Sequence, residues 1–374
     1  MTAQVAHYTN LDDRISIWDG WRGMAILLVL IDHFANIPFL KEGRMGVDVF
    51  FVLSGMLMSK ILFEKRTSLS TFYVRRFSRI IPLYWLFLLV LFGAAAMVGL
   101  PFSMGEVVAN VFFLRTYFPG EPHMWNSAIP AEHLWSLNVE EHAYVLMSLV
   151  TLIFAGLLKP ALALLALAGL SLLAVMGFYF GTDYPREIYF IRTETAVCFV
   201  FLSAAYNLLK AHYGIRVNPW VPVVTLMLAF ACYSMDIPKI FRLAVAPFLL
   251  AFTINHLQEI APFARRLLTF AWLRYLGLWS FSIYIWQQPF YIYKESIIKT
   301  AEQMTSSDFS DPIIALVSVS IALITVAVGM ASYYWYEQPV RTWINTRYAR
   351  KQSALPKDDF FRQAASDRTP ELKP

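Results

Sequence analysis

The sequence has little charge and almost no cysteine. Only 15% of its 374 residues are Asp, Glu, Lys or Arg, and it contains two cysteines. Soluble domains carry about 25% charged residues, so this composition argues against a soluble protein. Cys198 and Cys232 lie in apolar segments without paired spacing, which excludes a disulfide framework, and we expect no bound metal. The net charge of +5 is modest and gives no indication of nucleic-acid binding.

Apolar residues are abundant instead, at 58% of the sequence, with 16% aromatic residues. They form windows close to the ~20 residues that a membrane-spanning helix needs. The pattern predicts an all-α, polytopic integral membrane protein with about ten transmembrane helices. The windows cover residues 23–40, 46–63, 80–99, 139–158, 161–180, 191–209, 220–236, 240–257, 274–294 and 313–336.

The basic residues predict the orientation of the chain. Loop 64–79 has the densest group of Lys and Arg and is therefore expected to face the cytoplasm. Two spans precede it, so segment 1–22 is expected on the same side, without signal cleavage. The membrane domain is then 23–340. The polar tail 341–374, predicted to be disordered from Lys351 onward, is cytoplasmic as well.

One apolar window carries ionisable residues well inside it. Arg22 opens the run, and the pair Asp32-His33 follows near its middle. A helical rise places His33 about 16 Å from Arg22, close to half of a ~30 Å hydrocarbon core. Ionisable groups at that depth are costly, and this favours a catalytic role. The structural alternative is a core histidine that hydrogen-bonds a nearby carbonyl.

Three arginines precede the third window. Arg75, Arg76 and Arg79 are three or four residues apart in pairs, so on a helix their side chains can converge on one anion. The planar guanidinium group binds phosphate with two hydrogen bonds. The alternative is a topology anchor that contacts lipid phosphates.

Further polar residues interrupt other windows. Glu140 and Glu141 open the fourth window, where the helix dipole favours carboxylates; alternatively, Glu140 orients His33 as a base. Ser54 lies inside the second window beside a glycine, which is typical of close helix packing. In the ninth window Gln287 and Gln288 precede a proline, and their amides are expected to replace the backbone bonding that the proline removes.

Together these segments resemble the acyltransferase-3 family of membrane O-acyltransferases, which modify bacterial surface glycans. The resemblance rests on the spacing of Arg22 and His33, the segment 46–55 (GVDVFFVLSG), the arginines before Pro82, the segment 135–141 (WSLNVEE) and the segment 337–339 (EQP). It implies transfer of an acyl group, usually acetyl, from cytoplasmic acyl-CoA to a sugar hydroxyl. It also implies an essential His33 with Arg22 beside it, in a bacterial inner membrane.

The chain departs from the family pattern at two places. Many members have histidine where this chain has Gln287, and the aromatic residue after the glutamate pair is displaced to Tyr144. The hydrolase-like domain fused to some members is expected to be absent.

These residues lead to a hypothesis in which the donor binds from the cytoplasmic side and the acceptor reacts at His33 inside the membrane. Arg75, Arg76 and Arg79, with Ser54, are the candidate donor-binding residues for acyl-CoA. His33, oriented by Glu140 or Asp32, acts on the acceptor hydroxyl, with Arg22 orienting the donor; a covalent acyl-enzyme relay remains open. The expected partners are acyl-CoA, a glycan or lipid-linked saccharide, and membrane lipid.

Two other functions fit the same residues. A proton-coupled transporter of a glycan or lipid-linked precursor would use His33, Glu140 and Glu194 as relay groups. A structural partner in a glycan-assembly complex would tolerate substitution at every polar position.

Overall fold

The computed structural model describes residues 17–35, 43–183, 185–234, 239–305 and 309–353. Within these ranges the chain is helical and contains no β-strand. The prediction of an all-α protein is confirmed.

Each of the ten predicted windows overlaps a helix. Four helical segments are long and apolar enough to cross a membrane by length and composition, namely Gly43–Glu64, Leu69–Val98, Leu158–Gly181 and Asp311–Lys351. Two shorter apolar helices are Val221–Tyr233 and Arg242–Asn255. These helices support the prediction of a polytopic membrane protein. The elements in the windows are the helical residues 17–30 with η1 (Ile31–Ala35), α2 (Gly43–Ser59) with η2 (Lys60–Glu64), α3 (Leu69–Val98), α5 (Trp135–Ile153), α6 (Leu158–Gly181), α8 (Thr193–Ala196) with α9 (Cys198–Tyr213), α10 (Val221–Ser234), α11 (Lys239–Asn255), α13 (Ala271–Ile292), and α15 (Asp311–Ser332) with η6 (Tyr333–Glu337).

Shorter or more polar elements connect these helices. They are α4 (Met104–Val111), η3 (Met124–Asn126), η4 (Glu132–Leu134), α7 (Arg186–Tyr189), η5 (Leu257–Glu259), α12 (Pro262–Leu268), α14 (Lys294–Thr305) and α16 (Gln338–Ser353). Helix α16 continues α15 and η6 into the segment predicted as a polar tail. Residues 351–353, where disorder was expected to begin, are helical, and residues 354–374 lie outside the described part of the chain.

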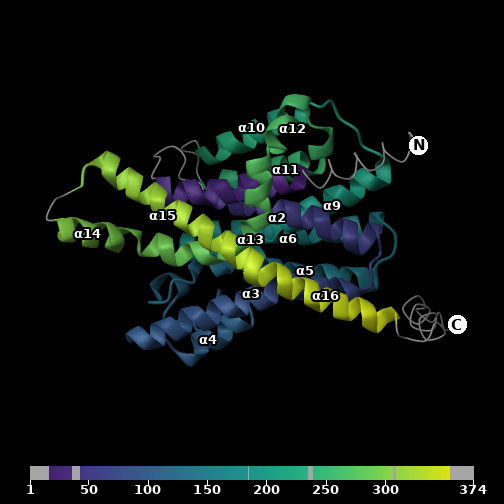
Figure 1. The fold of residues 1–374 in the computed structure, drawn as a ribbon. Helices are drawn as coiled ribbons and strands as arrows, with labels where there is room; N and C mark the ends of the chain where they lie inside the picture. Colours follow the sequence, from purple (N-terminus) through teal and green to yellow (C-terminus); the bar gives the residue numbers. More distant parts are fainter. Residues whose placement is uncertain (1–16, 36–42, 184, 235–238, 306–308, 354–374) are drawn as a thin grey trace, which may run out of the picture.

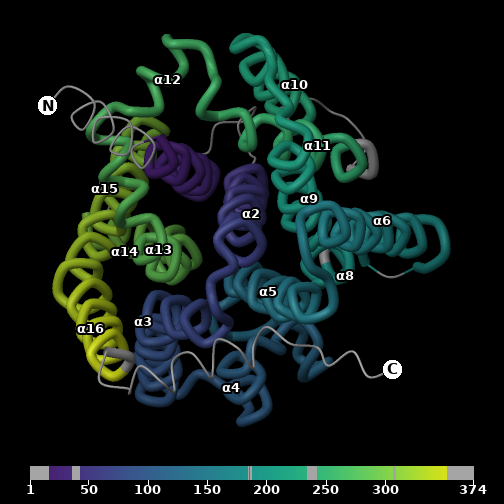
Figure 2. The backbone as a smooth tube through the Cα atoms, turned by 90° about the vertical axis from the view of Figure 1, so that its right-hand side faces the viewer, coloured from purple at the N-terminus to yellow at the C-terminus, as the bar shows by residue number. Residues whose placement is uncertain are grey.

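The long helices run side by side in one general direction (Figure 1). Viewed from the end of the bundle, α2 lies in the middle, between the first helix, α13, α5, α9 and α11 (Figure 2). Helix α2 packs against α9, α11 and α5, while α13 packs against α15 and α3 against α16. Residues of this central helix line one wall of the site described below.

Glycines allow the first helix to approach α13 closely. A Cβ atom at Gly277 would lie 1.7 Å from the Asp19 carbonyl oxygen, and one at Gly23 would lie 1.9 Å from the Leu273 carbonyl oxygen. Both obstacles are backbone atoms, which cannot move aside as a side chain tip does. The short spacing positions the helix that carries Arg22 and His33 against the helix that carries Gln287.

We expect Gly277→Leu to prevent correct assembly of the bundle. Overpacking typically costs about 1–3 kcal/mol, and the loss is expected to reach or exceed the upper end because the clash is with backbone. The measurement is the yield of monodisperse protein in detergent and its thermal unfolding midpoint. Gly93→Leu is the matched control, since a Cβ there has no neighbour within 4 Å. Equal stability of the two variants would contradict this packing.

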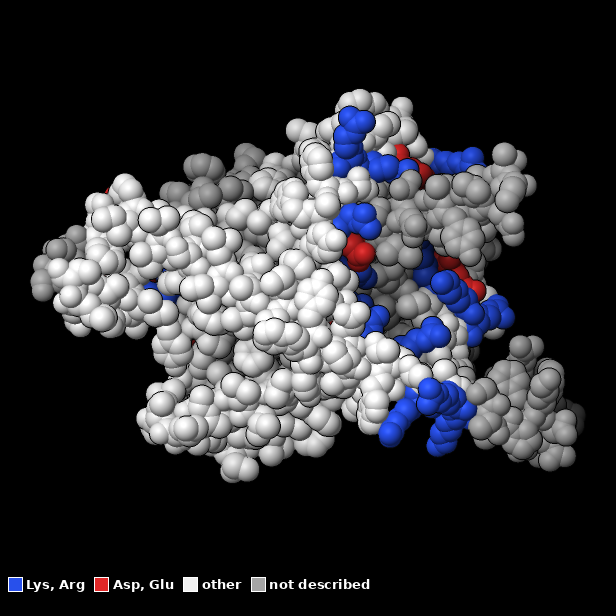
Figure 3. Space-filling model, in the orientation of Figure 1, with Lys and Arg blue, Asp and Glu red and all other residues white. Residues whose placement is uncertain are grey.

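Charged side chains gather at one end of the bundle. On the face in Figure 3, most of the Lys and Arg lie towards the right-hand end, and the central and left-hand parts are almost uncharged. The last turns of α12 and α16 carry Arg265, Arg266, Arg350 and Lys351. Such a distribution is typical of a membrane protein with a charged aqueous face and an uncharged lipid-facing band.

Candidate functional site

His33 lies in a π-helical turn and is held on three sides. Its Nδ1 atom lies 2.6 Å from Gln287 Oε1, and its ring stacks on Tyr291 with centroids 4.1 Å apart. Lys294 Nζ donates a hydrogen bond of 2.9 Å to the His33 carbonyl oxygen. π-Helical turns occur frequently at functional sites, because they redirect a side chain and alter backbone bonding. The position and the plane of the imidazole ring are therefore fixed.

The contact with Gln287 determines which nitrogen of His33 is free. An amide oxygen only accepts hydrogen bonds, so Nδ1 carries the proton and donates it to Gln287 Oε1. In the neutral ring Nε2 then has the lone pair. Its distance to Asp32 Oδ2 is 4.0 Å, which is too long for a hydrogen bond. The His33 side chain keeps 19% of its surface accessible, so Nε2 can accept a proton from a reactant.

His33 forms no hydrogen bond with Asp32 or Glu140, the two carboxylates that the sequence suggests as its partners. Asp32 stays beyond hydrogen-bond distance of Nε2, and Glu140 instead forms an ion pair with Arg76 at 2.9 Å. The partner is Gln287, at the position where many family members have histidine. The amides of Gln287 and Gln288 bond to side chains, and not to the backbone near Pro289 as the sequence suggested.

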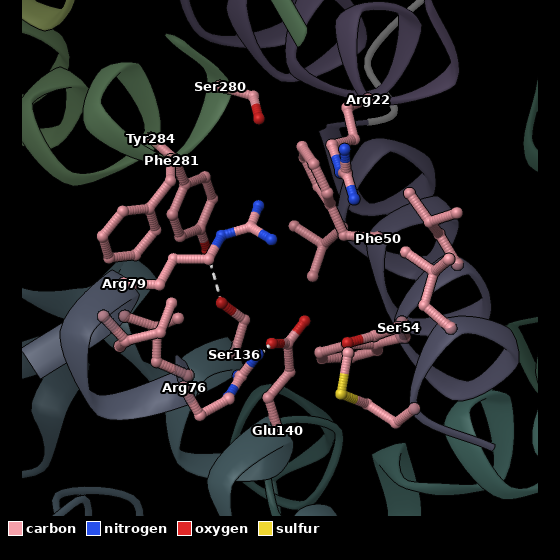
Figure 4. Close-up of a pocket in the computed structure, with 17 residues that line it drawn as sticks. Arg22, Phe50, Ser54, Arg76, Arg79, Ser136, Glu140, Ser280, Phe281 and Tyr284 are labelled. Atoms are coloured by element: carbon pink, nitrogen blue, oxygen red, sulfur yellow. Dashed lines mark hydrogen bonds and ion pairs between the residues drawn. The ribbon is translucent and has the colours of Figure 1, made fainter. Parts of the chain in front are cut away.

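A pocket opens between the first helix and α2, α3, α5 and α13. It contains about 720 Å³ of empty space, part of it open to solvent. Arg22 and Arg79 extend towards its middle, with Glu140 and Ser54 on the opposite wall (Figure 4). The lining residues are Arg22, Val47, Phe50, Phe51, Leu53, Ser54, Leu57, Met58, Arg76, Arg79, Ile80, Ser136, Leu137, Glu140, Ser280, Phe281 and Tyr284.

The three arginines of α3 do not converge on one anion. Arg75 is exposed and does not line the pocket. Arg76 is neutralised by Glu140 and Glu141. Arg79 lines the pocket and has no carboxylate within ion-pair distance in the described part of the chain.

Arg22 joins Arg79 in the pocket. Arg22 Nη1 donates to Asp19 Oδ1 at 2.7 Å, which leaves other donors of its guanidinium group available. The two guanidinium groups therefore give the pocket a cationic side (Figure 4).

Arg76 is instead the centre of a structural network. Its Nε donates to Glu141 and its Nη2 to Glu140, at 3.0 and 2.9 Å. Its guanidinium carbon lies 3.8 Å from the ring centroid of Tyr144. The Tyr144 hydroxyl donates to Glu140 and contacts Ser54 Oγ. Ser54 is thus tied to α5, and the displaced aromatic residue Tyr144 completes this network.

Replacing Arg76 with glutamine is expected to destabilise the protein by up to about 3 kcal/mol, because it leaves two partly buried carboxylates without their cation. The readout is the thermal unfolding midpoint in detergent. The triple variant Arg76→Gln, Glu140→Gln, Glu141→Gln removes the unpaired charges and should recover most of the loss. A single variant as stable as the parent protein would contradict this assignment.

The pocket ends close to His33. Tyr284, which lines the pocket, lies three residues before Gln287 on α13, a rise of about 4.5 Å. Its hydroxyl donates to the His133 carbonyl oxygen at 2.7 Å and lies 2.8 Å from Ser136 Oγ. The pocket wall and the support of the imidazole are therefore built on successive turns of one helix.

The three residues of a proton-relay transporter lie in separate networks. His33 bonds to Gln287, and Glu140 to Arg76. Glu194 accepts from Arg192 and from Tyr117, at 2.5 and 2.6 Å. Among the described residues, no side-chain hydrogen bond or ion pair joins one of these networks to another.

Comparison with known proteins decides the family. The model of the acyltransferase-3 family, described as an acyltransferase domain, matches residues 15–332. The chain belongs to this family. The matched range contains His33, its partner Gln287 and every residue that lines the pocket.

Curated relatives in the family are named as O-acetyltransferases. Peptidoglycan O-acetyltransferase OatA of Listeria monocytogenes is 28% identical over 72% of this chain and 48% of its own length. The putative peptidoglycan O-acetyltransferase YrhL of Bacillus subtilis is 24% identical over 90% of this chain and 56% of its own length. O-acetyltransferase OatA of Staphylococcus aureus is 25% identical over 86% of this chain and 56% of its own length. The chain spans about half the length of these relatives, and no solved structure matches it.

Proposed function

We propose that the protein transfers an acyl group, acetyl in the simplest case, from acyl-CoA to a hydroxyl of a cell-surface or exported glycan. The family assignment supports the reaction class, and the names of the relatives support a glycan acceptor. The observation that carries the proposal is a cationic pocket whose wall ends one helical turn from the partner of His33.

The pocket suits the donor in both charge and polarity. Arg79 and Arg22 offer guanidinium groups to the phosphates of CoA. Phe50, Leu53 and Phe281 provide apolar walls for the narrow pantetheine arm. Arg76, already saturated by Glu140 and Glu141, supports the pocket wall and leaves phosphate binding to the other two arginines.

The charge distribution supports an orientation for this pocket. The end of the bundle with the Lys and Arg residues in Figure 3 faces the cytoplasm under the positive-inside rule. In a bacterial inner membrane that side contains acyl-CoA. The glycan then approaches His33 from the opposite side of the membrane.

His33 serves as the general base. Its Nε2 atom takes the proton of the acceptor hydroxyl while the oxygen attacks the thioester carbonyl carbon. A carbon–oxygen bond forms, the carbon–sulfur bond breaks, and the proton passes to the leaving thiolate of CoA. Gln287 keeps Nδ1 protonated, and Tyr291 keeps the ring in its plane.

The test uses purified protein, acetyl-labelled acetyl-CoA and isolated glycan strands. We expect label on the glycan, released as acetate by mild base, and stoichiometric free CoA. Hydrolysis or transport of the glycan without label would contradict an acyltransferase and favour the transporter.

A further inference from the structure

A chain of side-chain hydrogen bonds connects His33 to a buried glutamate. His33 Nδ1 lies 2.6 Å from Gln287 Oε1, Gln287 Nε2 donates to Gln288 Oε1 at 3.3 Å, and Gln288 Nε2 donates to Glu132 Oε2 at 2.9 Å. The exposed fractions of Gln287, Gln288 and Glu132 are 0%, 5% and 9%. The chain therefore lies inside the protein, where water competes little for its bonds.

The chain has a direction that originates at Glu132. An ionised carboxylate only accepts hydrogen bonds, so the Gln288 amide must present its nitrogen to Glu132. The Gln288 oxygen then faces Gln287, whose amide must present nitrogen to Gln288 and oxygen to His33. Rotation of either amide would bring two acceptors or two donors together at the next link.

We propose that Glu132 is a positioning residue that fixes the tautomer of His33 through Gln288 and Gln287. The inference rests on the proposed function in one respect, namely that Nε2 of His33 is the reacting atom. Glu132 touches neither reactant. It keeps Nδ1 protonated and Nε2 free, although it lies two amides away from the imidazole.

The surroundings of the chain favour this role. Glu132 forms its side-chain bond to Gln288 from the short turn η4, ahead of α5, and Arg115 adds a positive charge nearby. A glutamine in contact with a histidine presents its oxygen or its nitrogen with similar ease when nothing else orients it. A base held in the wrong tautomer loses about 10⁴ in kcat in serine proteases.

The experiment compares Glu132→Leu, Glu132→Gln and Gln288→Met with the parent protein. Nitrogen NMR of ¹⁵N-histidine-labelled protein in nanodiscs identifies the protonated nitrogen, and His33→Asn assigns the signal of His33. Burial raises the pKa of the Glu132 carboxyl, against the hydrogen bond from Gln288 and the charge of Arg115, so spectra are recorded at mildly alkaline pH.

We expect the parent His33 to be protonated at Nδ1 alone, and Glu132→Leu and Gln288→Met to show a mixture of tautomers. Their kcat should fall in proportion to the fraction of His33 left protonated at Nδ1, by about twofold for an equal mixture, with the KM for acyl-CoA unchanged because the tautomer does not affect donor binding. Glu132→Gln can present either its amide oxygen or its amide nitrogen to Gln288, so it should keep the side-chain volume but restore the parent tautomer and rate only in part. An unchanged Nδ1-protonated ring in both Glu132→Leu and Gln288→Met would overturn the proposal.

The design separates this inference from the proposed function. The NMR measurement needs no turnover, so it tests the chain of hydrogen bonds by itself. Should Glu132→Leu fail to fold, Gln288→Met still interrupts the chain without altering η4. Retention of activity by His33→Asn would refute the function and leave the tautomer result standing.

Discussion

Replacing His33 with alanine is expected to abolish acyl transfer. A positioned general base contributes about 10²–10⁴ in rate. His33 is partly exposed, and its Nδ1 bonds to Gln287, which lies about one helical turn from the pocket residue Tyr284 on α13. The measurement is the initial rate of label transfer from acyl-CoA. Binding of the donor should change little, since His33 does not line the pocket.

The control for this variant is His212→Ala. His212 is exposed in the last turn of α9, and its loss should leave transfer at the parent level. Both proteins should insert into the membrane in equal amounts. Normal transfer by His33→Ala would remove the proposed base.

Replacing Arg79 with glutamine should raise the KM for acyl-CoA by about 10- to 150-fold. Hydrogen bonds to charged groups contribute about 1.5–3 kcal/mol. Among the described residues no carboxylate lies within ion-pair distance of Arg79, so its guanidinium group is available to bind a phosphate. The measurement is a titration of acyl-CoA at saturating acceptor. The KM for the glycan should stay close to that of the parent.

Arg75→Gln is the matched control for the donor site. This variant removes the same charge from the same helix, but the Arg75 side chain is exposed and lies outside the pocket. A simple topology anchor predicts equal, small effects for the two variants. Equal KM values for acyl-CoA in Arg75→Gln and Arg79→Gln would therefore contradict the assigned donor site.

The helices could be predicted from the sequence because hydrocarbon imposes a simple requirement. Apolar windows of spanning length must form helices to satisfy their backbone, and all ten predicted windows overlap helices. Their ends were harder to predict. Helix α3 begins at Leu69, and α15 continues through η6 into α16, since helices extend beyond the apolar region without a change in composition.

The side-chain partners of the site could not be predicted from the sequence. From their spacing along α3, Arg75, Arg76 and Arg79 are equally good candidates to bind the donor. In the structure the glutamates of α5 form ion pairs with Arg76, and Arg79 lines the pocket without such a pair. The same ion pair removes Glu140 from His33. Such choices depend on which helices are neighbours, and periodicity within one helix carries no information about that.

The catalytic role of His33 stays a prediction, and its side-chain partner in the structure is Gln287, not Glu140 or Asp32. Gln287 and Gln288 precede Pro289, and a proline removes a helical hydrogen bond. The sequence therefore predicts that their amides bond to the backbone there. The structure instead directs both amides sideways, towards His33 and Glu132. No sequence signal marked Glu132, which lies in a loop far from both glutamines in the chain.

In the proposed reaction, His33 lies between a donor on the charged side and an acceptor on the other side of the membrane. The most direct test of this arrangement is transfer in sealed proteoliposomes of uniform, protease-determined orientation, with labelled acyl-CoA on one side and the glycan on the other. We predict labelled glycan only when acyl-CoA faces the end with α12 and α16. Transfer only when both reactants share one side, or only when the donor faces the opposite end, would contradict the account.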